Sequence, residues 1–172
     1  GKVSSGVVAS ARLGAKVTMS GAFGDDSYGR FCREDFARHG IDVENVLLRE
    51  NETTSLSVVL SERKTATRQI IFRTGSAKPL RMEEIDLDRL KNSEYLFISG
   101  INDQIADLMD IAKENGVKIF IDADGYSKRM EESIPKIDVF VGSEFVFDAL
   151  FPGAKEKGYE HLTEECRNIM NR

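Results

Sequence analysis

The stretch that most constrains the fold of this chain runs from residue 11 to residue 30 and reads ARLGAKVTMSGAFGDDSYGR. Gly14 predicts the end of a helix, because glycine tolerates the left-handed conformation that helix C-termini often adopt. The residues that follow predict a short buried strand over 17–22. Asp25 or Asp26 then predicts the cap of a new helix that begins directly after it. A helix-strand-helix passage of this kind indicates the α/β class.

Gly21 and Gly24 predict a glycine-bearing loop that interrupts the strand. Such a loop ahead of a helix can bind phosphate, because backbone N–H groups and the helix dipole attract anions. Asp25 and Asp26 would repel a phosphate there, whereas both suit a helix cap. Neither G-x-x-x-x-G-K-[ST] nor G-x-G-x-x-G occurs in the chain. We therefore interpret this loop as structural.

Helices and strands alternate along most of the chain. Apolar periodicity predicts helices over 4–13, 27–39, 83–91, 104–115, 127–133 and 143–150, and a last helix with Leu162, Cys166, Ile169 and Met170 on one face. Short apolar runs predict further strands over 94–100, 117–122 and 138–141. Strands that alternate with helices imply right-handed crossovers and a mostly parallel sheet.

The segment from 44 to 74 differs from the rest of the chain. Its short β-rich runs, at 46–48, 55–60 and 69–73, are separated by polar turns. This pattern predicts a hairpin or a meander inside the alternating chain. Such an interruption commonly forms a lid or a subunit contact, although it can also be an edge hairpin with no further role.

Composition excludes some classes of function. The 172 residues are 41% apolar, which is enough for one globular domain, and the net charge is −5 with no cluster of Lys or Arg. We therefore expect no nucleic-acid partner, since phosphate neutralisation needs a basic face. No apolar run approaches the roughly 18 residues of a transmembrane helix, and no signal peptide is visible, so we expect no membrane partner.

The cysteines and histidines predict neither a metal site nor a nucleophile. Cys32 and Cys166 lie far apart in helical patterns. That arrangement is typical of free thiols in a reducing compartment, so we expect a cytoplasmic protein. His39 and His161 stand alone, and we interpret both as surface helix residues.

Four predicted strand ends carry small or polar residues, at 21–26, 99–103, 122–125 and 142–145. Ligands of open α/β sheets bind at the carboxyl ends of the strands, so this composition suits a binding crevice. Short loops before helices have the same composition for capping, and we weigh the two interpretations evenly. Asp122 and Asp124 could hold a metal or a sugar hydroxyl, but capping of the following helix or turn is the favoured interpretation.

An ordered series of motifs runs through nearly the whole chain. They are Gly1, Gly14 and Gly24 at signature spacing, then 11–15, 24–29, 40–43, Thr53-Thr54, 75–80, 95–100, 120–122 and 137–144. On these motifs the chain resembles the ribokinase-like (PfkB-type) carbohydrate kinases. The segment Phe72-Arg-Thr-Gly-Ser-Ala77 is most similar to the sugar-acid (2-keto-3-deoxygluconate) and fructose kinase branches.

The resemblance implies both a fold and an activity. The fold is a three-layer, Rossmann-type, mostly parallel sheet with helices on both faces, and a small β-meander lid at about 44–74. The activity is transfer of the ATP γ-phosphate to a sugar hydroxyl with Mg²⁺ assisting, by positioning, charge stabilisation and an Asp base. The sugar or sugar acid would lie under the lid. Lid strands in the family often pair subunits, which implies a possible homodimer.

The resemblance also implies particular site residues. Gly1 matches a glycine that packs against the sugar, Arg73 a lid arginine that meets the substrate carboxylate, and Asp122 a position near the substrate and phosphates. Ser143 and Glu144 lie where the nucleotide-binding motif is expected. Arg73 could instead be an exposed strand residue, and the other polar side chains could serve as helix caps or first-turn acids. No residue is assigned as catalytic or as a metal ligand.

The chain departs from the family pattern at several positions. Ser5 takes the place of the signature Asn, Val7 that of a small residue, and Val146 that of the carboxylate in an Asn-x-x-Glu motif. The D-T-x-G-A-G-D segment, with the catalytic Asp, is expected beyond Arg172, and the first family strand before Gly1. We therefore expect a single incomplete domain that lacks the C-terminal ATP-binding part and is inactive alone.

Three hypotheses remain open from the sequence. The chain is part of an active sugar kinase, or it is a degenerate family member that binds a sugar, a nucleotide or a partner without turnover. Alternatively, it is an α/β interaction domain that pairs through its β-rich segment. Turnover, binding without turnover, and self-association are the three observations that separate them.

Overall fold

The computed structural model describes residues 1–153, 155–157 and 159–171. The chain divides into two compact units, one formed by Ser4–Ile85 and the other by Asp86–Arg172 together with Gly1–Val3. Each unit has helices and parallel strands, which confirms the predicted α/β class. Among the described residues, no helix has the length and apolar character needed to cross a membrane.

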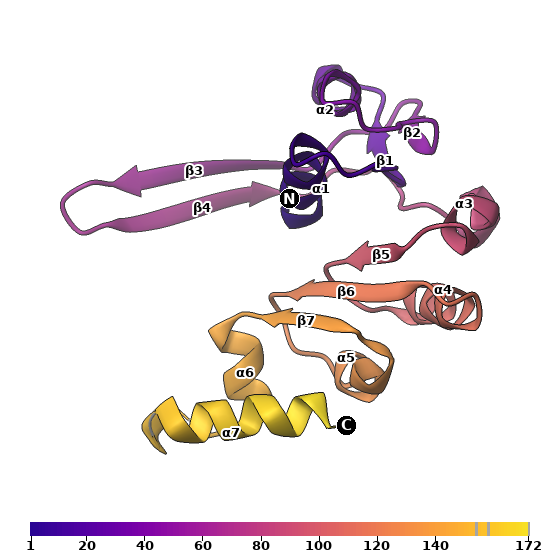
Figure 1. Cartoon of the computed structure of the whole chain (residues 1–172). Coiled ribbons are helices and arrows are strands. Elements are labelled where there is room, and N and C mark those ends of the chain that lie inside the picture. The colour runs from indigo at the N-terminus through magenta and orange to yellow at the C-terminus, as the bar shows by residue number, and fades with distance from the viewer. Residues whose placement is uncertain (154, 158, 172) are drawn as a thin grey trace. The chain divides into compact units, whose positions relative to one another are not determined.

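The unit of Ser4–Ile85 is built around two parallel strands and one hairpin (Figure 1). Its elements are α1 (Lys2–Arg12, which begins in the other unit), β1 (Gly21–Gly24), α2 (Ser27–Arg38), β2 (Val46–Arg49), β3 (Leu56–Glu62), β4 (Thr67–Arg73) and the 3₁₀ turn η1 (Met82–Glu84). β1 pairs with β2 in parallel, from Gly21 opposite Val46 to Gly24 opposite Arg49. The buried side chains are Val7, Phe36, Ile41, Val46, Thr54 and Leu80.

The strand predicted over 17–22 is wrong in position. The strand is Gly21–Gly24, which contains both glycines that were expected to interrupt it. Residues before it form only an isolated bridge, between Thr18 and Asp42. Glycine is required in this strand because a Cβ at Gly24 would lie 2.3 Å from the carbonyl oxygen of Glu52. Close approach of another backbone thus outweighs the low intrinsic strand propensity of glycine.

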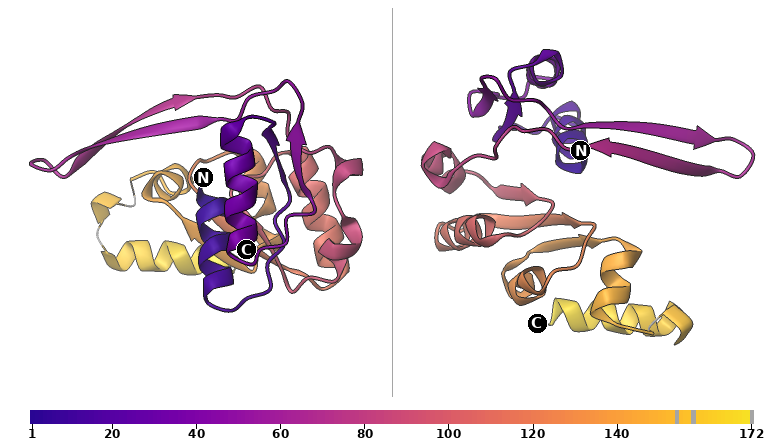
Figure 2. Two further views of the ribbon diagram at one scale, coloured as in Figure 1. Left: turned by 90° about the horizontal axis from the view of Figure 1, so that it is seen from above. Right: turned by 180° about the vertical axis from the view of Figure 1, so that it is seen from behind.

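The β-rich segment also differs from the expected lid at about 44–74. β2 does not belong to the hairpin, because it completes the parallel pair with β1. β3 and β4 form an antiparallel hairpin with Leu56 opposite Arg73 and Glu62 opposite Thr67. In both views of Figure 2 this hairpin extends away from β1 and α2 of its own unit.

The second unit contains a three-stranded parallel sheet in the order β5-β6-β7. Its elements are α3 (Leu87–Lys91), β5 (Tyr95–Ile98), α4 (Asp103–Glu114), β6 (Lys118–Ala123), α5 (Lys128–Ser133), η2 (Ile134–Lys136), β7 (Val139–Gly142), α6 (Glu144–Leu150), η3 (Lys155–Lys157) and α7 (Tyr159–Met170). The helix predicted over 83–91 is divided into η1 and α3, because Asp86 caps α3 through the backbone N–H of Arg89.

The core of this unit lies between β6 and its neighbouring helices. Met109 and Ala112 of α4, Ile119 and Ile121 of β6, and Val146 of α6 are fully buried. The apolar face predicted for the last helix is only partly right, because Ile169 is buried while Cys166 and Met170 are exposed. The side chain of Leu162 lies outside the described residues.

Candidate functional site

Polar side chains gather at the carboxyl end of β6. Burial alternates along this strand, so that Ile119, Ile121 and Ala123 face the core while Asp122 lies on the other face. This is the period-2 pattern of a strand with one buried face. The carboxylate of Asp122 is therefore half-buried at the strand end, where open α/β sheets bind their ligands.

Lys2, at the start of α1, supplies the positive charge at this point. Its Nζ lies 3.3 Å from Oδ1 of Asp122 and forms a second ion pair with Oδ1 of Asp124. The hydrogen bond to Asp124, followed by that to Asp122, raises the pKa of the Lys2 ammonium above its ordinary value. The two carboxylates and the ammonium thus form a partly exposed group of mixed charge.

Ser143 joins the same group from the next crossover. Its backbone N–H donates to the carbonyl oxygen of Ala123 at 2.9 Å, and its hydroxyl donates to the carbonyl oxygen of Asp124 at 3.2 Å. Ser143 also caps α6, since its Oγ accepts from the backbone N–H of Val146 at 3.5 Å. We call Lys2, Asp122, Asp124 and Ser143 the strand-end cluster.

The structure brings together some of the residues expected from the sequence. Asp122 and Ser143 belong to the strand-end cluster, Gly1 immediately precedes Lys2, and Glu144 is the first residue of α6. Arg73 lies in the other compact unit, where it is exposed at the end of β4.

The capping interpretation of Ser143 is confirmed by its bond to Val146, and it coexists with the place of Ser143 in the cluster. Asp122 caps no described helix, because the N-cap of α5 is Ser127. The pairing of Asp122 with Lys2 is therefore not explained by local helix geometry.

Lys2 is the member of this cluster that sequence reasoning missed. It is separated from Asp122 by 120 positions, so no periodicity connects the two. One local signal existed: a lysine in the first turn of a helix opposes the helix dipole, and α1 has no acidic residue there to offset it. A residue that is locally unfavourable often has a role elsewhere.

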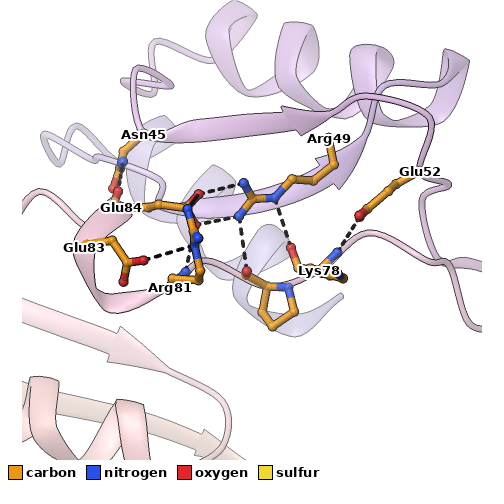
Figure 3. Close-up of polar contacts among 8 residues, drawn as sticks. Asn45, Arg49, Glu52, Lys78, Arg81, Glu83 and Glu84 are labelled. Carbon is orange, nitrogen blue, oxygen red and sulfur yellow. Dashed lines mark hydrogen bonds and ion pairs between the residues drawn. The ribbon is translucent and has the colours of Figure 1, made fainter.

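A second polar network lies in the other unit and is structural (Figure 3). The guanidinium of Arg49 donates to both carboxylate oxygens of Glu84, at 2.8 and 2.6 Å, and to the carbonyl oxygens of Lys78 and Pro79. The bonds from Arg49 to the carboxylate, with one from the backbone N–H of Arg81, lower the pKa of Glu84 far below its ordinary value. The network fastens the segment that follows the hairpin to the end of β2.

The donor set does not favour a resident metal. Among the described residues, no group of three or more His, Cys, Asp and Glu side chains is arranged to hold a metal ion. The carboxylates of Asp122 and Asp124 are the oxygen type that Mg²⁺ prefers, but Lys2 already pairs with both. Carboxylates beside an ammonium can instead accept from hydroxyls, while the ammonium donates to an anion.

Comparison with known proteins places this geometry in a family. The model of the pfkB family of carbohydrate kinases matches residues 1–168, so the chain belongs to that family. It is 28% identical over 159 residues to a 5-dehydro-2-deoxygluconokinase of Clostridium perfringens, covering 81% of this chain and 47% of that protein. It is 29% identical over 152 residues to a ribokinase of Haemophilus influenzae, covering 84% and 48%.

Solved structures agree on the fold. A fructokinase from Xylella fastidiosa superposes with a TM-score of 0.70 at 20% identity, covering 95% of this chain and 57% of that one. A sugar kinase from Pyrococcus horikoshii in complex with ATP gives a TM-score of 0.58 at 17% identity, covering 79% and 48%. The ribokinase-like fold expected from the sequence is thus confirmed. The chain spans about half the length of the curated relatives it matches.

Proposed function

We propose that the full-length protein containing this chain transfers the γ-phosphate of ATP to a hydroxyl of a sugar or sugar acid. The observation that carries the proposal is the match of residues 1–168 to the pfkB carbohydrate kinases. The strand-end cluster supports it, since a half-buried carboxylate beside an ammonium suits a polyhydroxylated, anionic reactant.

Each site residue has a role in this proposal. Asp122 would accept hydrogen bonds from substrate hydroxyls, with Gly1 allowing the sugar to approach the backbone. Ser143 and Glu144 would lie beside the nucleotide at the start of α6, and Arg73 would meet a substrate carboxylate. Mg²⁺ would be held chiefly by the phosphates of ATP, as is usual for this ion.

The direct test is ADP release by the full-length protein with ATP and a panel of ribose, fructose, 2-keto-3-deoxygluconate and 5-dehydro-2-deoxygluconate. Asp122→Asn should lower kcat/KM by about a hundredfold, whereas Asp107→Asn, on the exposed side of α4, should leave it unchanged. No turnover of any sugar would contradict the proposal. The 172-residue chain alone should show no turnover.

Arg73 gives a sharper test of the substrate class. Arg73→Met should raise the KM for a sugar acid about tenfold and leave the KM for a neutral sugar unchanged, because only the acid has a carboxylate to pair. Arg68→Met is the matched control, since residues 68 and 73 point to opposite faces of the same strand. An equal effect on both sugars would exclude Arg73 as a carboxylate ligand.

A family member without turnover is the second candidate. Val146 stands where the family resemblance implies a carboxylate, and its side chain is fully buried, so it meets no ligand. Calorimetry of the full-length protein with sugars, with and without ATP, separates the candidates. Binding without ADP release would favour the second.

We also propose that the hairpin β3–β4 pairs two copies of the chain. The support is the exposure of adjacent apolar side chains, which is unusual for so many of them. About half exposed are Val58, Val59, Leu60, Ile70, Ile71 and Phe72.

The free thiols of Cys32 and Cys166 support our further proposal of a reducing, cytoplasmic location.

A further inference from the structure

The hairpin β3–β4 has no apolar core of its own to hold it in place. All its residues except Leu56 are exposed, on both faces. A hairpin that buries so little against its own unit is oriented within that unit by the chain segments that lead into it and out of it. We call these segments, residues 52–55 and 75–78, the hairpin root.

The two sides of the root are joined by polar contacts. The backbone N–H of Thr53 donates to Oγ of Ser76 at 2.9 Å, and the backbone N–H of Ser76 donates to Oγ1 of Thr53 at 3.1 Å. The backbone N–H of Gly75 donates to Oγ of Ser55 at 3.0 Å. Hydrogen bonds therefore hold the two sides of the root together.

Asp26 connects this root to the body of its unit. One carboxylate oxygen, Oδ1, accepts from the backbone N–H of Gly29 and from the hydroxyl of Thr54, both at 2.8 Å. The other, Oδ2, accepts from the backbone N–H of Thr54 at 2.8 Å. Oγ1 of Thr54 also accepts from the backbone N–H of Gly24 at 3.1 Å. One buried threonine thus ties the root to α2 and to β1.

Three glycines let backbone segments pack directly against one another at this junction. A Cβ at Gly29 would lie 2.0 Å from the carbonyl oxygen of Gly24, and one at Gly75 would lie 2.2 Å from that of Thr53. Gly24 is equally constrained, against Glu52. The junction is thus close-packed. Neighbouring backbone cannot shift locally to compensate for a change in the hydrogen bonds of Asp26.

We infer that Asp26 is a positioning residue that sets the orientation of the hairpin on β1 and α2 through Thr54, and so positions the hairpin residues used in substrate binding. The second half of this inference rests on the proposed function. The first half concerns one unit only and stands independently. Asp26 touches no reacting group and acts through Thr54.

The protonation state of Asp26 supports the assignment. The hydrogen bond from the backbone of Thr54, and then that from Gly29, lower the pKa of the Asp26 carboxyl to about 2. The group is therefore an acceptor with both oxygens throughout the neutral range.

Asp26→Asn separates the two tasks of this side chain. Asn is as good an N-cap as Asp, so its amide oxygen can keep the bond from Gly29. Its amide N–H₂ then faces the backbone N–H of Thr54, and two donors cannot bond to each other. Asp25→Asn is the matched control, because it makes the same charge change at the neighbouring carboxylate, which pairs with Arg30 instead of the hairpin root.

A second pair of variants tests the junction from the other side. Thr54→Val keeps the shape of the buried side chain but removes the hydroxyl that bonds to Asp26 and Gly24. Thr54→Ser keeps the hydroxyl and should behave like the unmodified protein. Circular dichroism establishes that each variant is folded before it is compared.

The orientation of the hairpin on α2 is measured by pulsed electron paramagnetic resonance. The distances are those between spin labels at Lys64→Cys, in the hairpin turn, and Arg33→Cys, on α2. The background carries Cys32→Ser and Cys166→Ser. Asp26→Asn and Thr54→Val should broaden the distribution about twofold, because buried polar networks rigidify the segments they join. Distributions as narrow as those of Asp25→Asn and Thr54→Ser would overturn the inference.

Kinetics of the full-length protein test the functional half. Asp26→Asn and Thr54→Val should raise the KM for the sugar about tenfold and leave the KM for ATP unchanged, because the hairpin is misplaced while the strand-end cluster is intact. Unchanged sugar KM values would overturn this half. If the unmodified protein shows no turnover, the proposed function fails, while the distance distributions still decide the role of Asp26.

Discussion

Strands β6 and β4 carry similar apolar residues, but the isoleucines of β6 are buried and those of β4 are exposed. β6 reads KIFIDA and β4 reads TRQIIFR, so each has two isoleucines and a phenylalanine. Ile119 and Ile121 of β6 are completely buried, whereas Ile70 and Ile71 of β4 are more than half exposed. The difference shows that an apolar strand stabilises a fold only where other elements cover it.

The polar contacts of the two regions show the same contrast. At β6 the apolar core holds the strand, and the carboxylates at its end are left for the strand-end cluster. At the hairpin, the root contacts of Asp26 and Thr54 and the Arg49–Glu84 network are what fasten the chain. The region with the weaker core is therefore the one whose position depends on hydrogen bonds and charge.

The largest expected difference comes from one substitution made in both strands. Ile121→Ala should lower the free energy of unfolding by about 3 kcal/mol, because it removes buried methyl groups and leaves a cavity. Ile70→Ala should change it by at most about 0.5 kcal/mol, since that side chain is half in water. Urea unfolding followed by circular dichroism measures both. Equal losses would show that the hairpin is covered in solution by something that stabilises it.

An intermediate effect is expected from the network that fastens the hairpin region. The pKa of Glu84 is lowered in the fold by Arg49, so its contribution to stability is present above the unfolded-state pKa of about 4.3 and is lost as the pH falls. Between about pH 5 and pH 2, the urea midpoint of the unmodified chain should therefore fall more than that of Glu84→Gln.

Glu83→Gln is the control for this experiment. Glu83 is the neighbouring carboxylate and pairs only weakly with an exposed guanidinium, that of Arg81. Its variant should keep the full acid dependence. Parallel pH profiles for Glu84→Gln and the unmodified chain would show that the network in Figure 3 does not stabilise the fold.

The comparison also explains how much could be read from the sequence. Strand β6 and helix α4 follow apolar periodicity, and both are predicted from the sequence. The caps follow from a polar side chain ahead of a helix: the sequence predicts Asp25 or Asp26, of which Asp26 is the cap, and offers Ser143 as a cap alternative. Gly24 is predicted to break the strand because glycine has a low strand propensity. The prediction is wrong because the backbone that packs against Gly24 and requires glycine there comes from Glu52, 28 positions later. Nothing local encodes such a contact.

The site residues divide along the same line. Asp122 and Ser143 were identified because strand ends and helix starts have short-range signals. Lys2 and the dual role of Asp26 were missed, since each depends on a partner far along the chain, Asp122 for one and Thr54 for the other. The exposure of the hairpin could not be predicted either, because a short run of consecutive apolar residues looks the same whether or not anything covers it.

The smallest expected effect on stability belongs to Val59→Thr, on the face of the hairpin that also carries Ile70 and Phe72. The side chain is half exposed and keeps its branched shape, so the urea midpoint should not move measurably. If the hairpin pairs two copies, however, the same change places a hydroxyl in an apolar contact, and association should weaken by about tenfold. Sedimentation at several concentrations measures this. Thr65→Ser, in the hairpin turn, is the control that should leave association unchanged. A concentration-independent monomer in every case would exclude the homodimer. Substrate binding would then be the only proposed role left for the exposed apolar side chains of the hairpin.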